Sequence, residues 1–379
     1  MVGSRPVTLL TGPRQTGKTS LLQRTFPDYD YVSLDLPRDA EQAEEDGRAF
    51  LARFGEPLIV DEVQYAPELL RYLKAAVDAA RGKHGRFVLT GSQKFALMQG
   101  VSESLAGRIS LIELHSLSLS ELEAGLGETA EGGRLWQWVL QGGYPEIYAE
   151  GLAADRFYAD YVATYLERDV RQALNVRNLR DFDRFLRMCA LRSGQLLNMH
   201  ALARDLGLAT TTVKSWLSVL EASGVVSLLS PYFGNVGKRL VKTPKLYFMD
   251  TGLQCFLIGI RSVAEIERSS LRGTLFETLA YGQIRRHFAS RGGTREIFFY
   301  RDHHGTEVDF VIPEAERLHL LEAKASTSPS ASAPAFSALT RALGDDAIAS
   351  RTILCTGRER RKVGEVTVES CVDLESLPV

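Results

Sequence analysis

The sequence predicts an α/β fold class with three domains, and three observations support this prediction. Short apolar runs alternate with helical patterns from residue 7 to 114, which indicates a parallel sheet covered by helices on both faces. Two short amphipathic helices and a strand follow between 196 and 229. Three further strand-like runs between 297 and 323 carry acidic side chains. A chain of 379 residues is long enough for two or three domains.

Composition limits the class of protein. Apolar residues make up 45% and charged residues 24%, as in ordinary soluble proteins. There is no run of eighteen apolar residues, and the N-terminus leads directly into the first predicted strand, so we expect a cytoplasmic protein without a membrane span or signal peptide. The net charge of −2 argues against a strongly basic nucleic-acid coat but allows local basic patches. No C-x-x-C spacing links the four cysteines, so we expect reduced thiols and no zinc site.

The first predicted strand, Val7–Leu10, leads into a glycine-rich loop. Residues 12–19 match the pattern G-x-x-x-x-G-K-[ST], and a helical pattern starts at Lys18. In such a loop the backbone N–H groups and the helix N-terminus bind phosphate, the lysine reaches the β- and γ-phosphates, and the Thr19 hydroxyl binds Mg²⁺. The alternative is a chance match in a glycine-containing turn. The predicted nucleotide-binding residues are Gly12, Pro13, Arg14, Gln15, Thr16, Gly17, Lys18, Thr19 and Ser20.

Two acids follow the apolar run Leu58–Val60, which is suited to a buried parallel strand. Ligands bind at the carboxyl ends of such strands, so Asp61 is predicted to bind Mg²⁺. Glu62 is predicted to activate the attacking water, a group that an ATPase needs and a small-molecule kinase does not. An acidic strand end that faces solvent is the alternative interpretation.

Polar residues beside the next two strands are further candidates. Thr90 and Ser92 follow the strand Phe87–Leu89, where a polar side chain could orient water near the γ-phosphate, although turn chemistry also explains this sequence. Arg108 precedes the strand-like run Ile109–Leu114 and is a candidate arginine finger, acting in its own chain or on a neighbouring subunit of a homo-oligomer. A solvated arginine beside a strand is the alternative.

The predicted domains are 1–125, 126–262 and 263–379. In the middle domain, residues 199–206 and 210–222 read as the two helices of a winged helix-turn-helix, and a strand starts at Val225. Only one cation, Lys214, lies on the exposed face of the second helix. Further cations, at Lys238, Arg239, Lys242 and Lys245, belong to the predicted wing. DNA binding and a packing or protein-interaction role remain equal alternatives for this region.

The third domain carries an acid on one strand and acid-x-lysine on the next, a pattern typical of restriction-endonuclease-like nucleases. Asp309 and Glu322 would bind a divalent metal, Lys324 would orient or activate water, and Glu277 would assist from a helix. Side chains alternate along a strand, so Glu322 and Lys324 share a face. A domain with this fold but no cleavage activity is the alternative.

Several sequence motifs together resemble those of the prokaryotic AAA-type ATPases that carry a conserved C-terminal region of unknown function. The resemblance spans nearly the whole chain. Besides 12–19, it rests on phrases at 60–64, 89–92, 105–108, 142–145, 167–169, 248–253 and 307–310. It implies an AAA+/STAND-like P-loop ATPase that uses ATP, a winged helix, and a nuclease-related C-terminal module. Members usually have a helical segment before the first strand, whereas this chain begins almost at Val7.

The expected function is therefore a Mg²⁺-dependent, ATP-binding and ATP-hydrolysing switch or motor that is coupled to nucleic acid. Two alternatives stay open at this point. One is an ATP-gated, metal-dependent nuclease of the defence or toxin type, and the other is an ATP-driven signalling scaffold without DNA contact. Loss of DNA cleavage in an Asp309→Ala variant would favour the nuclease.

Overall fold

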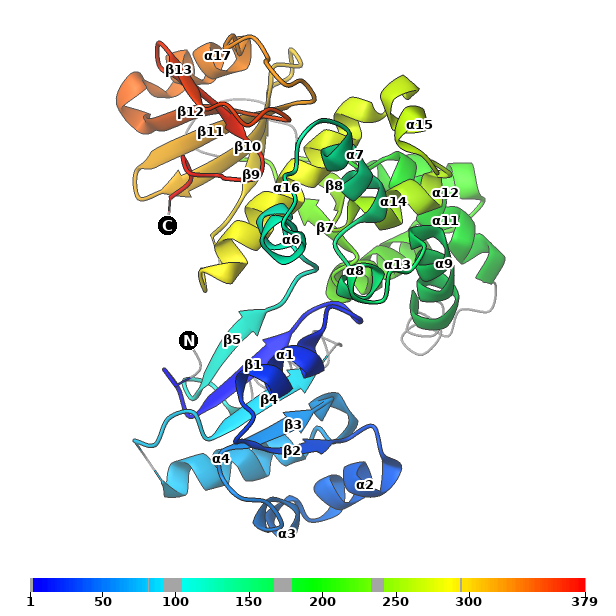
Figure 1. Cartoon of the computed structure of the whole chain (residues 1–379), viewed down its shortest axis with the longest axis vertical. Coiled ribbons are helices and arrows are strands. Elements are labelled where there is room, and N and C mark those ends of the chain that lie inside the picture. The colour runs from blue at the N-terminus through cyan, green and yellow to red at the C-terminus, as the bar shows by residue number, and fades with distance from the viewer. Residues whose placement is uncertain are drawn as a thin grey trace. The chain divides into compact units, whose positions relative to one another are not determined.

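The computed structural model describes residues 3–80, 82–91, 104–166, 179–232, 242–293 and 295–378 (Figure 1). Two compact units make up the chain. The N-terminal unit comprises Met1–Ser116 with Ala222–Gly224, and the C-terminal unit comprises Leu117–Glu221 with Val225–Val379. The middle and third predicted domains thus share one compact unit, and a boundary near 262 stays a prediction.

A five-stranded parallel sheet forms the centre of the N-terminal unit, as predicted, in the order β2-β3-β4-β1-β5. Its strands are β1 (Val7–Thr11), β2 (Asp30–Ser33), β3 (Leu58–Asp61), β4 (Phe87–Gly91) and β5 (Ile109–Glu113). The helices are α1 (Lys18–Thr25), α2 (Pro37–Glu45), α3 (Gly47–Ala52), α4 (Leu69–Ala79) and the 3₁₀ turn η1 (Val63–Tyr65).

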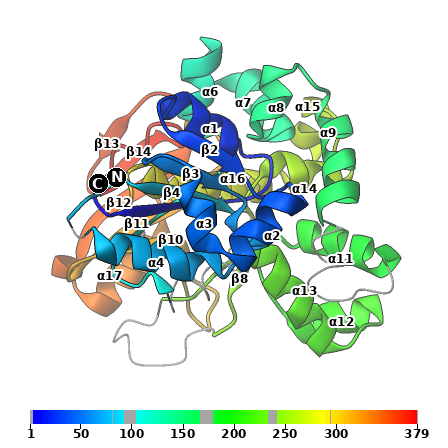
Figure 2. The same ribbon diagram turned by 90° about the horizontal axis from the view of Figure 1, so that it is seen from below.

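Alternating side chains give this sheet two buried faces. Leu9 and Val60 pack with residues of α3 and α4, whereas Leu10 and Ile59 pack with Leu22 of α1. Figure 2 shows α1 on one side of the sheet and α3 and α4 on the other. Side chains alternate along a strand, so each polar residue at a strand end faces one of these two layers, and the face decides which helix it meets.

Helices dominate the first part of the C-terminal unit. They are α6 (Leu119–Leu126), α7 (Gly132–Gln141), α8 (Pro145–Ala149), α9 (Ala154–Tyr161), the π-helical turn η2 (Val162–Leu166), α11 (Leu179–Leu191), α12 (Met199–Leu206) and α13 (Thr210–Ala222). The strands β6 (Gln195–Leu196), β8 (Lys245–Phe248) and β7 (Val226–Leu229) form a three-stranded antiparallel sheet in that order. α12 and α13 have the predicted bounds, and Val213, Trp216, Leu217 and Leu220 of α13 are buried.

A six-stranded mixed sheet follows in the same unit, in the order β13-β14-β12-β11-β10-β9. Its strands are β9 (Phe298–Arg301), β10 (Glu307–Glu314), β11 (Arg317–Lys324), β12 (Ile348–Cys355), β13 (Arg361–Val363) and β14 (Val366–Ser370). The helical elements are α14 (Thr251–Ile258), α15 (Val263–Arg268), α16 (Arg272–Ser290), α17 (Pro334–Leu343) and η3 (Asp345–Ala347). Phe310 packs in one core with Phe276 of α16, and Val311 packs in another with Phe336 of α17, so the sheet is covered on both faces.

Candidate functional site

The glycine-rich loop connects β1 to α1 and closes tightly on itself. Gly12 has a φ of 147°, and a Cβ there would lie 2.0 Å from the carbonyl oxygen of Leu114, so this position requires glycine. Gly17 adopts the left-handed conformation, with a φ of 85°, at the start of α1. The Lys18 ammonium donates to the carbonyl oxygens of Gly12, at 3.0 Å, and Pro13, at 2.8 Å. The predicted loop is therefore formed by the strand, turn and helix that the motif requires.

Burial gives Lys18 the properties of a phosphate-binding group. The side chain is 6% exposed, and burial lowers the pKa of its ammonium to about 8, while the carboxylates of Glu62 and Asp61 raise it and Arg14 lowers it. A desolvated cation gains more interaction free energy from contact with a phosphate than a solvated cation does. The residues of the loop thus fit a nucleotide phosphate. Ser20 lies exposed on α1.

Asp61 is the centre of a polar cluster at the carboxyl end of β3. It is 3% exposed, and its Oδ2 accepts hydrogen bonds from Thr19 Oγ1 at 2.7 Å and from the Tyr31 hydroxyl at 2.9 Å. Its Oδ1 accepts from Thr90 Oγ1. Hydroxyl and carboxylate oxygens are the ligands that Mg²⁺ prefers, so the pair Thr19 and Asp61 fits a magnesium ion.

Strand alternation explains why these side chains meet. Asp61 lies two residues after Ile59, and Thr90 lies two residues after Val88; both apolar residues pack with α1, the helix that carries Thr19. Tyr31 is one residue before Val32, which packs on the other face. Burial and the hydrogen bond to Asp61 raise the pKa of Tyr31, so its hydroxyl remains a donor. Tyr31 was not among the residues predicted from the sequence.

Glu62 leaves the strand at a sharp turn next to this cluster. It has the left-handed φ of 55°, and its backbone N–H donates to Thr90 Oγ1 at 3.0 Å. Its Oε2 accepts a hydrogen bond from the Gln64 side-chain amide. The charge of the Glu62 carboxylate raises the pKa of Lys18, so this carboxylate lies near the phosphate loop. Thr90 thus lies where the sequence predicted a polar residue, and the other candidate, Ser92, falls outside the described residues.

The structure does not bring Arg108 to the phosphate loop of its own chain. Its carbonyl oxygen accepts from the N–H of Val7, at the amino end of β1, whereas the loop follows Thr11 at the carboxyl end. The length of β1 separates these two edges of the sheet by about 15 Å. The Arg108 guanidinium pairs with both Asp78 carboxylate oxygens, at 2.7 and 3.1 Å. Action on a neighbouring subunit is the part of the arginine-finger prediction that stays a prediction.

A second polar centre lies in the C-terminal unit, where the nuclease-like acids were predicted. One carboxylate oxygen from each of Glu277 (α16), Glu307 and Asp309 (both β10) lies within 4.8 Å of the other two. Asp309 Oδ2 accepts from the Ala323 N–H at 2.9 Å. Burial raises the pKa of Asp309 well above its usual range, and the charges of Glu277 and Glu322 raise it further.

Glu322 and Lys324 complete this acidic centre. They lie at the end of β11, and their side chains form an ion pair of 2.7 Å. Burial raises the pKa of Glu322, while the hydrogen bond and charge of Lys324 lower it. All four residues predicted from the sequence are therefore near one another. Glu307 was not among the predicted site residues, although it begins the same strand as Asp309 and is also acidic.

Lys245 is also part of the acidic centre, so of the two alternatives left open for the predicted wing this residue has the packing role and not DNA contact. It is the first residue of β8 and only 1% exposed, because its ammonium pairs with Glu277 Oε1 at 2.9 Å and Glu307 Oε1 at 2.5 Å. Two of the three clustered acids thus already hold a cation, so Glu277, Glu307 and Asp309 as arranged do not fit a divalent metal, and metal binding by Asp309 and Glu322 stays a prediction. Lys242 is exposed, and Lys238 and Arg239 lie outside the described residues.

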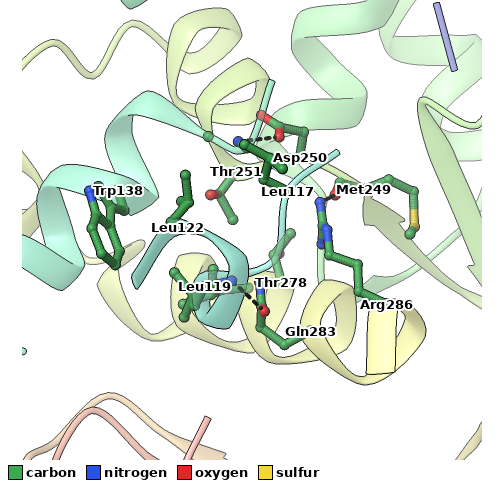
Figure 3. A pocket seen from close by; sticks show the side chains of 13 residues that line it. Leu117, Leu119, Leu122, Trp138, Met249, Asp250, Thr251, Thr278, Gln283 and Arg286 are labelled. Carbon is green, nitrogen blue, oxygen red and sulfur yellow. Dashed lines mark hydrogen bonds between the residues drawn. The ribbon is translucent and has the colours of Figure 1, made fainter. Parts of the chain in front are cut away.

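Asp250 forms a third buried polar centre, which joins distant segments of the C-terminal unit. Its carboxylate accepts from the N–H groups of Gly143, Gly252 and Leu253 at 2.8–3.1 Å, and from the Tyr158 hydroxyl at 2.7 Å. Figure 3 shows Asp250 beside a small pocket. Nearby, Arg286 donates to the Met249 carbonyl at 2.8 Å. These bonds satisfy backbone groups, so we interpret the centre as structural.

Three family models match successive parts of the chain. The AAA domain family matches residues 4–123, a domain of unknown function (DUF8612) matches 132–264, and a second one (DUF4143) matches 272–375. Among solved structures, a Walker-type ATPase of Pyrococcus abyssi is 19% identical with a TM-score of 0.43, over 67% of this chain and 91% of that one. RuvB of Thermotoga maritima is 18% identical with a TM-score of 0.27, over 59% and 81%.

The parallel sheet, the phosphate loop and the family match define the N-terminal unit as that of a P-loop AAA-type ATPase. Two uncharacterized proteins, Rv2008c of Mycobacterium tuberculosis and Mb2031c of Mycobacterium bovis, are each 33% identical to the chain over 370 residues, which is 96% of this chain and 79% of theirs. The chain belongs to the same family as these two proteins, and in this chain the AAA domain occupies residues 4–123. Within the described ranges, no helix has the length and apolar character needed to cross a membrane.

Proposed function

We propose that this protein binds ATP with Mg²⁺, hydrolyses the γ-phosphate, and acts as a nucleotide-driven switch or motor coupled to nucleic acid. The observation that carries the proposal is the joint placement of the buried Lys18 ammonium and the Thr19–Asp61 pair at one loop. One group binds phosphate and the other binds the ion that accompanies it. Mg²⁺-dependent hydrolysis of ATP needs both groups.

Each residue of this site has a separate role in the proposal. Lys18 and the loop N–H groups bind the phosphates, and Thr19 and Asp61 hold Mg²⁺, which neutralises phosphate charge when bound. Glu62 accepts a proton from the attacking water. Thr90 fixes both acids, since it donates to the Asp61 carboxylate and accepts from the Glu62 N–H. Tyr31 orients Asp61 from the neighbouring strand.

Replacing Lys18 tests the binding half of the proposal. Lys18→Ala is expected to weaken ATP affinity roughly 100-fold, because it removes a desolvated, charge-assisted contact to phosphate. Titration of a fluorescent ATP analogue into each protein measures this. Lys74→Ala is the matched control, because Lys74 is an exposed lysine on α4 of the same unit. Equal ATP affinity in the wild type and Lys18→Ala would contradict the proposed site.

The middle region of the chain supports the coupling to nucleic acid. α12, α13 and the three-stranded sheet have the order expected of a winged helix-turn-helix, and Lys214 and Lys242 are exposed in this region. Phosphate contacts from such lysines supply affinity without sequence specificity. In the acidic centre Lys245 already pairs with Glu277 and Glu307. This favours a binding role for the third module over cleavage.

One DNA experiment separates the proposal from its two alternatives. Plasmid and linear DNA are incubated with the wild type and Asp309→Ala in Mg²⁺ or Mn²⁺, with and without ATP, and binding is followed at several salt concentrations. We expect DNA binding that weakens steeply with salt, and no cleavage. Cleavage that is lost in Asp309→Ala while ATP hydrolysis persists would establish the ATP-gated nuclease instead. Neither binding nor cleavage would point to the signalling scaffold.

A further inference from the structure

Lys245 lies at a point where three elements of the C-terminal unit converge. Its ammonium contacts carboxylates of α16 and β10, at 2.9 Å from Glu277 and 2.5 Å from Glu307. The Phe299 ring lies on another side, with its centroid 5.6 Å from the ammonium. Glu277 Oε1 also accepts a hydrogen bond from the Tyr247 hydroxyl. The ammonium is therefore enclosed by partners of opposite charge and by aromatic rings.

Charge explains why this lysine stays protonated in a buried place. Burial by itself lowers the pKa of Lys245, but the carboxylates of Glu277, Asp309 and Glu307 outweigh burial and raise it. In return, Lys245 lowers the pKa of Asp309, which burial and the charges of Glu277 and Glu322 raise. Removing one partner from a buried ion group leaves uncompensated charge, which is strongly unfavourable. The ammonium thus stabilises the acids that a metal ion would otherwise neutralise.

A divalent ion at this centre would compete with Lys245 for the carboxylates of Glu277 and Glu307. Mg²⁺ and Ca²⁺ bind carboxylate oxygens directly, at about 2.0–2.6 Å, and an ammonium hydrogen-bonded to the same oxygens excludes such an ion. The ammonium is also part of the chain, so it competes at a high effective concentration. We infer that Lys245 is the resident cation of the acidic centre of Glu277, Glu307 and Asp309, and that it keeps this centre closed to divalent metal ions.

The position of Lys245 in the fold gives this contact a regulatory character. Lys245 begins β8, which pairs with β7 and β6 in the three-stranded sheet, whereas Glu307 lies on β10 of the six-stranded sheet. The centre can open to a metal only if β8 shifts against β10 or the Lys245 side chain leaves. The ion pairs thus tie the state of the acidic centre to the position of the three-stranded sheet. This inference does not depend on ATP binding.

Manganese binding tests the inference directly. Nucleotide-free wild type, Lys245→Met and the control Lys242→Met are titrated with Mn²⁺, and free Mn²⁺ is measured by electron paramagnetic resonance. Methionine keeps an unbranched side chain without the charge, and Lys242 is an exposed lysine three residues earlier. We expect Lys245→Met to gain one Mn²⁺ site that binds roughly tenfold or more tightly than any Mn²⁺ bound by the other two proteins. Adding Asp309→Asn to Lys245→Met should remove it.

Two results would overturn the inference. A Mn²⁺ site in the wild type that disappears in Asp309→Asn, and that is as tight as in Lys245→Met, would show that Lys245 does not exclude metal. A folded Lys245→Met protein without a new site would also overturn it. If Lys245→Met does not fold, the double variant Lys245→Met/Glu277→Gln removes one carboxylate in compensation. Its melting temperature should then rise with Mn²⁺, and an unchanged melting temperature counts against the inference.

Discussion

Glu62→Gln is expected to leave ATP binding intact and to slow hydrolysis by about 10²–10⁴-fold, the usual contribution of a general base. Glutamine keeps the size and the hydrogen-bonding reach of the side chain, but its amide cannot take a proton from water. The backbone of Glu62 is held by its N–H bond to Thr90, so the substitution should not move the strand end. The variant should therefore hold ATP without turning it over.

Separate measurements of nucleotide affinity and phosphate release check this expectation. Glu45→Gln is a suitable control, because Glu45 is an exposed glutamate at the end of α2 in the same unit. Both proteins should bind ATP like the wild type, and only Glu62→Gln should lose hydrolysis. Hydrolysis at the wild-type rate in Glu62→Gln would mean that another group activates the water, and the role proposed for Glu62 would be withdrawn.

Asp250→Ala is expected to destabilise the C-terminal unit by about 3–5 kcal/mol, among the largest effects of a single substitution. The carboxylate satisfies three backbone N–H groups and the Tyr158 hydroxyl, and its side chain is buried. Alanine would leave these donors without an acceptor in a place that water does not reach freely. The loop at Gly143 and the start of α14 would lose their common anchor.

Thermal and chemical unfolding of the full chain, with a probe in the C-terminal unit, measures this effect. Tryptophan fluorescence is suited to it, because Trp138 and Trp216 are buried in this unit. Asp346→Ala, at an exposed aspartate in η3, is the control and should change stability by less than about 0.5 kcal/mol. If Asp250→Ala and the control are equally stable, the interpretation of Asp250 as a structural joint is wrong.

The phosphate loop and the five strands of the N-terminal unit could be predicted because their signals are local. Residues 12–19 contain the glycines, the lysine and the threonine of one site within eight positions, so no tertiary information was needed. Tyr31 could not be found in this way. Its contact with Asp61 depends on β2 lying next to β3 in the sheet, and the sequence does not state this order.

Arg108 and Lys245 show two different reasons why the sequence left alternatives open. Arg108 precedes a parallel strand, and residues before such strands lie at the edge opposite the phosphate loop, so chain order alone argued against action in its own chain. For Lys245 the sequence signal was weaker: it is a lysine at the start of the otherwise apolar strand Lys245–Phe248. Its partners come from 32 or more positions further along the chain, and only the fold brings them together.

The motifs at 142–145 and 248–253 are likewise related only through the fold. The sequence shows them as two separate motifs without chemistry of their own. In the structure they meet at Asp250, where a Cβ on Gly142 would lie 2.2 Å from Asp250 Oδ1. Their shared function is to join the loop after α7 to the start of α14, which follows from packing and not from any local pattern.

Phosphate release from ATP is the measurement that tests the central claim most directly. The full-length wild type and Lys18→Ala are compared in Mg²⁺ and in excess chelator, at equal protein concentration. The account predicts release by the wild type that requires Mg²⁺, and none above background for Lys18→Ala. Release that is equal in the two proteins, or that persists without the metal, would contradict the assignment of the site to ATP hydrolysis.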